Sequence, residues 1–257
     1  MPSSPLLTPP VAVIIGASSG IGAALARELA QEGYRLALLA RRGDALQALA
    51  AELTAGRPDA EEAVRIYPHD VTDYEHIPTL FQRILAEMGR MDVVVYAAGV
   101  LLPVAEDEYT FEKDRAMLEV NLMGAVAWLG QAAAYFQTQG EGHIVGISSV
   151  AGDRGRVKNP AYQASKAGLT NYLESLRNRL TRRGVHVLTV KPGFVDTPML
   201  QSAGGGAFWV ISPEQAAADI AKAIRKRKQV IYTPARWRWV MLTIQHIPSF
   251  LFRRLSF

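Results

Sequence analysis

The chain has 257 residues, 49% of them hydrophobic and 20% charged, a composition that excludes a disordered protein and suits one large α/β domain or two small ones. It contains no cysteine, which excludes disulfides and thiolate metal sites and favours a reducing compartment, so we expect a cytoplasmic protein. No apolar run reaches the roughly 18 residues that a membrane-spanning helix needs.

The net charge of +4 is unevenly distributed along the chain. From Ile220 to Phe257 there are nine basic and no acidic residues, and subtracting these nine charges from +4 leaves −5 on the remainder. A basic segment at the end of an otherwise acidic chain predicts that this segment meets something anionic.

Strands and helices alternate after a proline-rich segment, residues 1–10, that we expect to form a flexible tail. Apolar, β-branched runs predict strands within residues 11–15, 35–40, 63–71, 91–99, 142–149, 185–193 and 229–233. Apolar residues at helical spacing predict helices over about 20–33, 43–55, 73–88 with Asp73 as its cap, 112–137, 159–182, and from Pro213 onward.

This alternation implies right-handed βαβ units and a parallel sheet. We therefore predict that residues 11–232 form a single-domain α/β fold, a Rossmann-type doubly wound parallel sheet of about seven strands with helices on both faces. Residues 233–257 would form a basic, amphipathic C-terminal extension. Ligands of such sheets bind beyond the carboxyl ends of the strands, so the residues that follow each strand are the candidates for a site.

A glycine-rich turn, GASSGIG, follows the first strand and opens the first helix. Glycines at 16, 20 and 22 permit a tight turn and let the backbone approach a pyrophosphate at the helix N-terminus. The turn is therefore a candidate dinucleotide site. Its residues in that role are Gly16, Ser18, Ser19, Gly20, Ile21 and Gly22.

Arg41 and Arg42 follow the second strand, where a protein that prefers NAD commonly carries an acidic residue. Arginine instead accommodates the 2′-phosphate of NADP, so these residues favour NADP(H) over NAD(H). A solvated basic turn is the alternative. After the third strand, Asp70 is placed to accept from the adenine amino group, although an aspartate there is equally suited to capping a turn.

Tyr162 and Lys166 stand four residues apart on a predicted helix and so share one face. A cation beside a phenol lowers the phenol's pKa, which would make Tyr162 an acid and base usable near neutral pH. The alternative is an ordinary Tyr–Lys contact on an exposed helix. Ser149 ends the fifth strand thirteen residues earlier, and Asn121 in mid-helix indicates a local disruption or a buried polar role.

Taken together, these motifs resemble the short-chain dehydrogenase/reductase family over about residues 11–232. The motifs that carry the resemblance are the glycine turn, Asp70-Val71, Ala97-Ala98-Gly99, Asn121, Ser149, Tyr162 with Lys166, and Pro192-Gly193. Backbone groups near Val195 and the Thr197 hydroxyl would complete the cofactor site by binding the nicotinamide carboxamide. One departure is Tyr96, which stands where the family usually has asparagine and is expected to loosen the support of the central sheet slightly.

The resemblance implies hydride transfer between NADP(H) and the carbonyl or secondary alcohol of a small substrate. Tyr162 would exchange the proton, Lys166 would lower the pKa of Tyr162 and hold the ribose, Ser149 would bind the carbonyl oxygen, and Asn121 would hold a water. No metal is expected, because the five histidines are scattered. A β-ketoacyl thioester reductase is the alternative enzyme. A non-catalytic nucleotide-sensing regulator is a further alternative, disfavoured by the intact catalytic set.

The substrate pocket is expected to be apolar, which suits a hydrophobic or lipid-like substrate. Its candidate lining residues are Leu101, Leu102, Val150, Met199, Phe208 and Trp209. Glycines 204–206 would let a lid open over it.

The resemblance also implies a homodimer or homotetramer that pairs through the helices at 112–137 and 159–182. Small side chains for close packing are offered by Ala125, Ala127, Ala132, Ala133 and Ala134.

The C-terminal extension places Trp237, Val240, Met241 and Ile244 at helical spacing, with arginines nearby. Such a helix suits an anionic membrane surface, at the inner face of a membrane, but equally suits packing on the protein's own body or on a partner subunit. Nucleic acid is not an expected partner.

Overall fold

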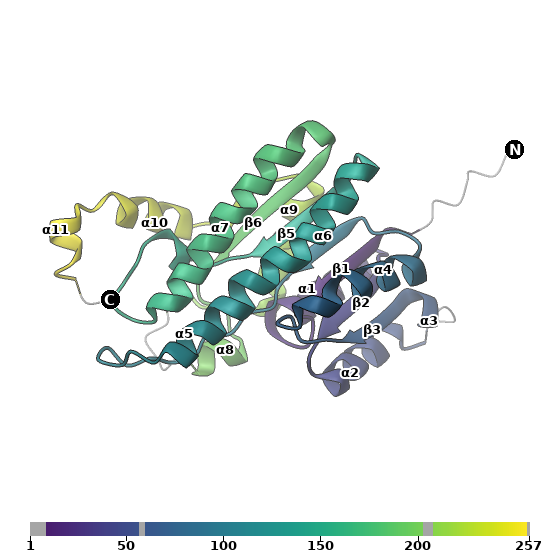
Figure 1. Cartoon of the computed structure of the whole chain (residues 1–257), viewed down its shortest axis with the longest axis horizontal. Coiled ribbons are helices and arrows are strands. Elements are labelled where there is room, and N and C mark those ends of the chain that lie inside the picture. The colour runs from purple at the N-terminus through teal and green to yellow at the C-terminus, as the bar shows by residue number, and fades with distance from the viewer. Residues whose placement is uncertain (1–8, 57–59, 203–207, 256–257) are drawn as a thin grey trace, which may run out of the picture.

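A seven-stranded, fully parallel sheet forms the centre of the molecule (Figure 1), as the sequence predicted. The structure gives the strand order, β3-β2-β1-β4-β5-β6-β7. The structure is a computed structural model, and it describes residues 9–56, 60–202 and 208–255. The strands are β1 (Val11–Ile15), β2 (Arg35–Ala40), β3 (Val64–Pro68), β4 (Val93–Tyr96), β5 (Gly142–Ile147), β6 (Val185–Pro192) and β7 (Val230–Thr233).

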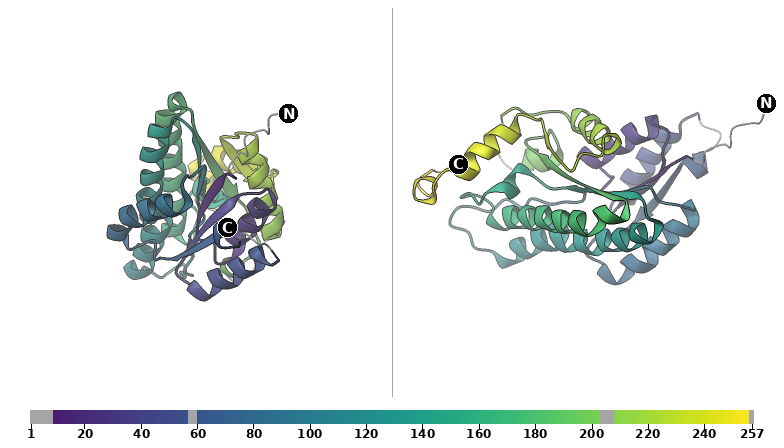
Figure 2. Two further views of the ribbon diagram at one scale, coloured as in Figure 1. Left: turned by 90° about the vertical axis from the view of Figure 1, so that its right-hand side faces the viewer. Right: turned by 90° about the horizontal axis from the view of Figure 1, so that it is seen from above.

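Helices cover both faces of the sheet, and two separate hydrophobic cores result (Figure 2). One face carries α1 (Gly20–Gln31), α2 (Gly43–Thr54) and α9 (Pro213–Arg225); the other carries α4 (Ile77–Met88), α6 (Gly124–Gln139) and α7 (Pro160–Leu180). Successive residues of β1 alternate between the two cores, with Val13 in one and Ile14 in the other. This alternation follows from the side-chain period of a strand, and burial on both faces explains why the strands are apolar throughout.

Two helices differ from their predicted form. The predicted helix at 73–88 begins as a 3-10 turn (Tyr74–His76) before α4, and the Asp73 carboxylate pairs with the His76 ring instead of capping a backbone N–H. The predicted helix at 112–137 consists of α5 (Phe111–Leu118), a π-helical segment (Glu119–Met123) and α6. Asn121 lies in the π-helical segment, so the local disruption that it indicated is present.

Shorter elements connect these helices. They are α3 (Ala60–Ala63), α8 (Pro198–Ser202) and two further 3-10 turns, Val150–Asp153 and Thr181–Arg183. The glycines at 204–206 that were expected to form a lid lie outside the described residues, as does most of the expected N-terminal tail.

The C-terminal extension forms α10 (Trp237–His246) and α11 (Ser249–Phe252), which lie at one end of the molecule (Figure 1). Trp237 and Met241 are buried against Val150 and Phe194, so this face of α10 packs on the body of the protein. The alternative that this helix packs on the protein's own body is therefore confirmed for the apolar face of α10. The periodicity of that face no longer supports contact with a membrane. No helix within the described ranges combines the length and apolarity needed to cross a bilayer.

A histidine pair joins the first halves of β5 and β6, at the sheet edge away from the strand ends that hold the predicted site. His143 and His186 face each other in the strand register, with their Nδ1 atoms 3.2 Å apart. Burial lowers the pKa of His143 to about 4, and the neighbouring His186 and Arg227 act in the same direction against Asp92. His143 therefore becomes protonated at a lower pH in the folded protein than in the unfolded chain, where it has its usual pKa of 6.5.

We expect the free energy of unfolding to fall as the pH is lowered from 6.5 to 4, because the unfolded chain binds more protons than the folded protein in that window. His143 makes the free energy of unfolding higher by up to about 3 kcal/mol above this pH window than below it. Urea unfolding at pH 7 and pH 4.5 would measure the difference, with His143→Asn as the comparison, since its amide still hydrogen-bonds but does not titrate there. An equal pH dependence in the variant would contradict this assignment.

Candidate active site

The glycine-rich turn lies directly on the end of β4. Gly16 has φ +97°, and a Cβ placed on it would stand 2.4 Å from the backbone nitrogen of Ala98. A Cβ on Gly22 would stand 2.1 Å from the Gly16 carbonyl oxygen. Neither position can carry a side chain without moving backbone, so bare backbone forms a cradle at the start of α1.

The two arginines after β2 have different partners. The Arg42 guanidinium lies over the glycine-rich turn, where Nη2 donates to the hydroxyls of Ser18 (3.0 Å) and Ser19 (2.9 Å). Arg41 points instead to Asp70, with Nη1 3.7 Å from Oδ2, and both side chains are exposed. Arg42 therefore places a cation beside the glycine-rich turn, whereas Arg41 faces Asp70.

Asp70 does cap a turn. Its Oδ1 accepts hydrogen bonds from the backbone N–H (2.9 Å) and the hydroxyl (2.8 Å) of Thr72. Burial acts to raise the pKa of Asp70, but these bonds and the nearby Arg41 outweigh it and hold the pKa below its usual value. The carboxylate stays ionised and oriented at the end of β3, where the sequence predicted an acceptor for adenine.

Lys166 is buried, with 4% of its surface exposed, so the alternative of a surface Tyr–Lys contact is wrong. Its Nζ donates to the carbonyl oxygen of Ile147 at the end of β5 (3.0 Å) and lies 5.8 Å from the centre of the Tyr162 ring. No acidic side chain within the described ranges forms an ion pair with it. Burial without a counter-charge lowers the pKa of Lys166 to about 8.

The pKa of Tyr162 is raised, which corrects the prediction that Lys166 lowers it. Burial of the phenol is the largest effect, and a hydrogen bond with Ser149 and the charge of Arg156 oppose it without cancelling it. Lys166 is not among the groups that shift this pKa, and its Nζ is directed at a backbone carbonyl. The Tyr162 phenol is therefore protonated at neutral pH and lies near the Ser149 hydroxyl.

Asn121 is fully buried and joins three parts of the site. Its Oδ1 accepts from the Val100 N–H (2.7 Å), and its Nδ2 donates to the Val100 carbonyl (2.9 Å) and to the Ser165 hydroxyl (3.1 Å). Oδ1 of Asn121 and Nζ of Lys166 lie 3.3 Å and 3.4 Å from the point where a Cβ on Gly99 would stand. The asparagine therefore fixes the loop after β4 beside the lysine. Its water-holding role stays a prediction.

The remaining predicted residues reach the site from β6 and the loops around it. A Cβ on Gly20 would stand 2.9 Å from the Thr197 side chain, so Thr197 lies against the glycine-rich turn. Met199 is in contact range of Gly99. Val150, Phe208 and Trp209 gather instead around Trp237, and Leu101 and Leu102 are half-buried in the loop after β4.

Tyr96 was expected to loosen the support of the sheet, and the structure corrects this: it is fully buried and donates to the Val120 carbonyl, so it ties the sheet to the π-helical segment. Two further residues near the site, Gln163 and Arg156, were not singled out from the sequence. Gln163 holds the loop before α7 through the backbone of Arg156 and Lys158. No local pattern marks Gln163 or Arg156, since their partners are set by how the loop folds back on the helix.

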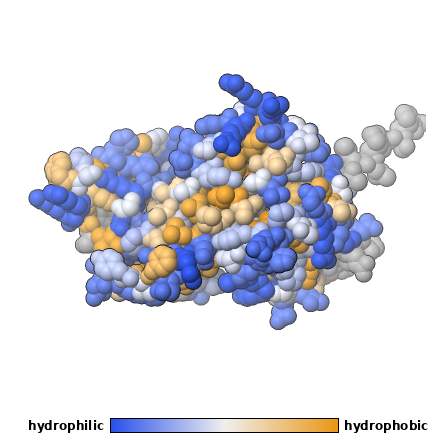
Figure 3. Space-filling model, viewed as in Figure 1, coloured by the Kyte–Doolittle hydropathy of each residue, from blue (hydrophilic) through white to orange (hydrophobic). Residues whose placement is uncertain are grey.

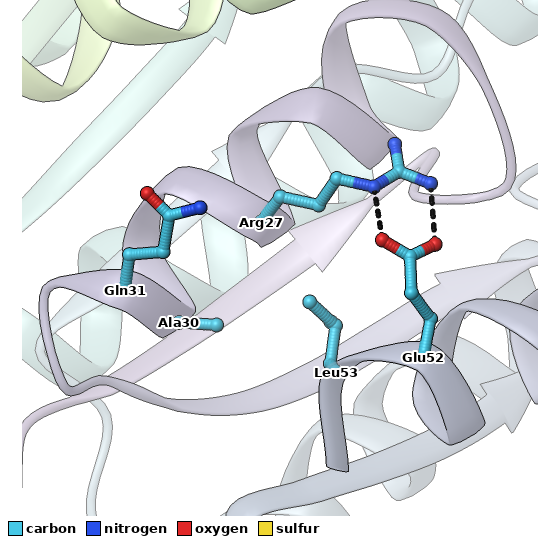
Figure 4. A pocket seen from close by; sticks show the side chains of 5 residues that line it. All are labelled: Arg27, Ala30, Gln31, Glu52 and Leu53. Atoms are coloured by element: carbon cyan, nitrogen blue, oxygen red, sulfur yellow. Dashed lines mark hydrogen bonds and ion pairs between the residues drawn. The ribbon is translucent and has the colours of Figure 1, made fainter. Parts of the chain in front are cut away.

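A surface hollow of about 270 Å³ between α1 and α2 is a separate feature (Figure 4). Arg27 and Glu52 form a two-bond ion pair across it (2.7 and 2.8 Å). These residues belong to the C-terminal parts of their helices, whereas the cradle lies at the N-terminus of α1. The hollow is therefore not part of the candidate active site.

Comparisons with known proteins show the family to which the chain is related. Residues 10–206 match the model of the short chain dehydrogenase family. The chain belongs to this family. An uncharacterized oxidoreductase of Mycobacterium tuberculosis is 35% identical over 248 residues, which cover 95% of this short-chain dehydrogenase and 96% of the relative.

Two solved structures share the fold of this short-chain dehydrogenase. An actinorhodin polyketide ketoreductase with NADPH is 28% identical, with a TM-score of 0.78 and coverage of 87% of this chain and 95% of the other. An alcohol dehydrogenase of the archaeon Thermococcus sibiricus, complexed with 5-hydroxy-NADP, is 28% identical, with a TM-score of 0.78 and coverage of 88% and 96%. The protein is thus an oxidoreductase of a family that uses a nicotinamide cofactor.

Proposed function

We propose that this short-chain dehydrogenase is an NADP(H)-dependent reductase of a small, apolar carbonyl compound, or the dehydrogenase of the corresponding secondary alcohol. The observation that carries the proposal is that Lys166, buried and bonded to the end of β5, lies beside the ring of Tyr162, with the Ser149 hydroxyl near the phenol. The cradle at Gly16 and Gly22 fits a dinucleotide, since glycines let the backbone approach the pyrophosphate and Arg42 brings a cation over the turn.

When bound, the nicotinamide supplies or accepts the hydride. In the reductive direction Tyr162 donates its proton to the carbonyl oxygen, and the Ser149 hydroxyl stabilises the charge that develops there. The raised pKa of Tyr162 supports reduction, because the phenol is protonated at neutral pH. Lys166 lies where it can bind the ribose hydroxyls, and Asn121 holds the Val100 loop next to it.

The residues proposed to hold the cofactor come from the ends of β1, β2, β3, β4 and β6 and the segments that follow them, from the π-helical segment and from α7. They are Gly16, Ser18, Ser19, Gly20, Ile21, Gly22, Arg41, Arg42, Asp70, Val71, Ala97, Ala98, Gly99, Asn121, Tyr162, Lys166, Pro192, Gly193, Val195 and Thr197. The position of Arg42 over the turn supports NADP(H), as do the NADPH and NADP-analogue complexes of the two similar structures.

A β-ketoacyl thioester reductase is the second candidate, and the similarity to a polyketide ketoreductase favours it. Both functions use the same catalytic residues, so the substrate discriminates between them. Steady-state oxidation of NADPH with simple ketones and with ketoacyl thioesters would separate the two. A protein that binds NADPH but oxidises it with neither class would instead be a nucleotide-sensing regulator.

Tyr162→Phe should lower kcat by at least about a thousandfold while NADPH binding persists, because the variant keeps the ring and loses the hydroxyl that donates the proton. Activity with a ketone panel and NADPH fluorescence titration would measure the two effects. Tyr172→Phe, on the same helix, is the matched control and should leave kcat unchanged. A Tyr162→Phe variant with near-normal kcat would refute the assignment.

Arg42→Ala and Arg41→Ala should each raise the KM for NADPH by about tenfold, with a change of less than about threefold for NADH, since each removes a charge-assisted contact to the 2′-phosphate. Initial rates with both cofactors would measure this. Arg27→Ala is the control, because Arg27 lies on α1 but pairs with Glu52 away from the cradle. Equal effects on both cofactors would show that the arginines do not read the phosphate.

We further propose that the protein forms a homodimer or homotetramer through α5, α6 and α7. Ala125 and Ala132 are buried in the protein's own core and Ala127 and Ala133 pack against it, which leaves Ala134 as the exposed alanine of this set on α6. Light scattering at micromolar concentration should give two or four times 28.1 kDa, and Ala134→Arg should reduce that mass. A wild-type mass of one chain would exclude this assembly.

A further inference from the structure

The indole of Trp237, in the C-terminal extension, lies directly on Gly193 in the predicted nicotinamide-binding turn. A Cβ on Gly193 would stand 1.9 Å from Trp237 Nε1 and 2.5 Å from two indole carbons, and these are the three nearest atoms. Gly193 is not among the glycines with positive φ, so its backbone is compatible with a side chain. Only the indole prevents one, and the turn and the helix therefore fit each other at this point.

Packing, and not a hydrogen bond, holds this indole in place. Trp237 is 3% exposed, and its Nε1 has no hydrogen-bond partner within the described part of the chain. The rings of Phe194, Phe208 and Trp209 surround it, with centroids 5.7, 5.3 and 5.8 Å away. Phe194 directly follows Gly193, so the aromatic contacts act on the turn itself.

The other end of α10 is attached to the loop that carries Ser149. Nη1 of Arg154 donates to the carbonyl oxygens of Ile244 (2.5 Å), Gln245 (3.1 Å) and Ile247 (2.6 Å) at the C-terminus of α10. A cation at this position also suits the negative end of the helix dipole. The Arg154 guanidinium stacks on the Phe252 ring of α11 at 3.9 Å.

A buried ion pair closes the connection between the two loops. Asp153, next to Arg154, pairs with Lys191 and accepts from the Tyr232 hydroxyl (2.9 Å). Lys191 is two residues before Gly193, and both members of the pair are nearly inaccessible. The extension therefore contacts both the loop after β5, which includes Ser149, and the turn after β6, which is predicted to bind the nicotinamide.

We propose that Trp237 is a positioning residue of the active site: its indole sets the backbone at Gly193 and thereby the place of the nicotinamide relative to Ser149 and Tyr162. This inference rests on the proposed nicotinamide-dependent function. The family match ends at residue 206, so Trp237 lies beyond it. Small displacements of a positioning element change rates strongly, because hydride transfer needs close alignment of the reacting atoms.

A reciprocal pair of substitutions tests the contact. Gly193→Ala should lower kcat/KM by about a hundredfold, because the added methyl group collides with the indole. Trp237→Leu should lower kcat by about tenfold and weaken NADPH binding. The double variant should recover at least about tenfold over Gly193→Ala alone, since leucine leaves room for the methyl group. Trp239 lies on the same helix and is 67% exposed, so Trp239→Leu should behave as wild type.

NADPH affinity by nicotinamide fluorescence and the thermal midpoint of the cofactor-free protein complete the test. A purely structural role would lower the midpoint of Trp237→Leu and leave kcat and NADPH affinity unchanged, which would overturn the proposal. Additive losses in the double variant would also overturn it. If Trp237→Leu does not fold, Trp237→Phe is used in its place, because it keeps an aromatic ring in the cluster. If none of the carbonyl compounds tested supports NADPH oxidation by the wild type, the proposed function fails. The NADPH affinities and thermal midpoints of the variants still decide whether Trp237 positions the Gly193 turn.

Discussion

A lysine ammonium held inside the protein, at the end of β5, is the constraint on which the candidate active site depends. Lys166 donates to the backbone carbonyl of Ile147, and no carboxylate among the described side chains pairs with it. Burying such a charge is costly unless polar groups surround it, and the lowered pKa of Lys166 expresses that cost. Its surroundings, Ile147, Gly99 and Asn121, are accordingly backbone, glycine and a fully bonded amide.

The π-helical segment follows from the same constraint. An extra residue in the helical turn turns the Asn121 amide inward, where it bonds Val100 and Ser165. Tyr96 supports the segment from the sheet by donating to the Val120 carbonyl, and a side chain on Gly124 would collide with its hydroxyl. Irregular helix geometry, a buried tyrosine and a glycine thus form one unit that brings polar groups to the lysine.

The C-terminal extension adds a second layer of support outside this unit. A parallel sheet leaves the loops after its strands projecting from one edge, and loops are less constrained than the elements that they connect. Here α10 packs on one loop through Trp237 and receives Arg154 from another. The basic residues of the extension partly serve this internal role: Arg236 lies 4.8 Å from the Trp209 ring.

The sequence alone determined the alternation of strands and helices, the parallel sheet and the strand ends where the site residues fall, because hydrophobic periodicity and the strand-end rule depend only on local pattern. Tertiary structure decided what those residues do to one another. It separated Arg41 from Arg42, raised the pKa of Tyr162, and gave Asn121 partners 21 and 44 residues away. It also decided that the apolar face of α10 covers the protein's own loops, since a helix that meets a membrane and one that meets a core have the same periodicity. Burial and partner choice are properties of the folded chain, and no spacing of residues encodes them.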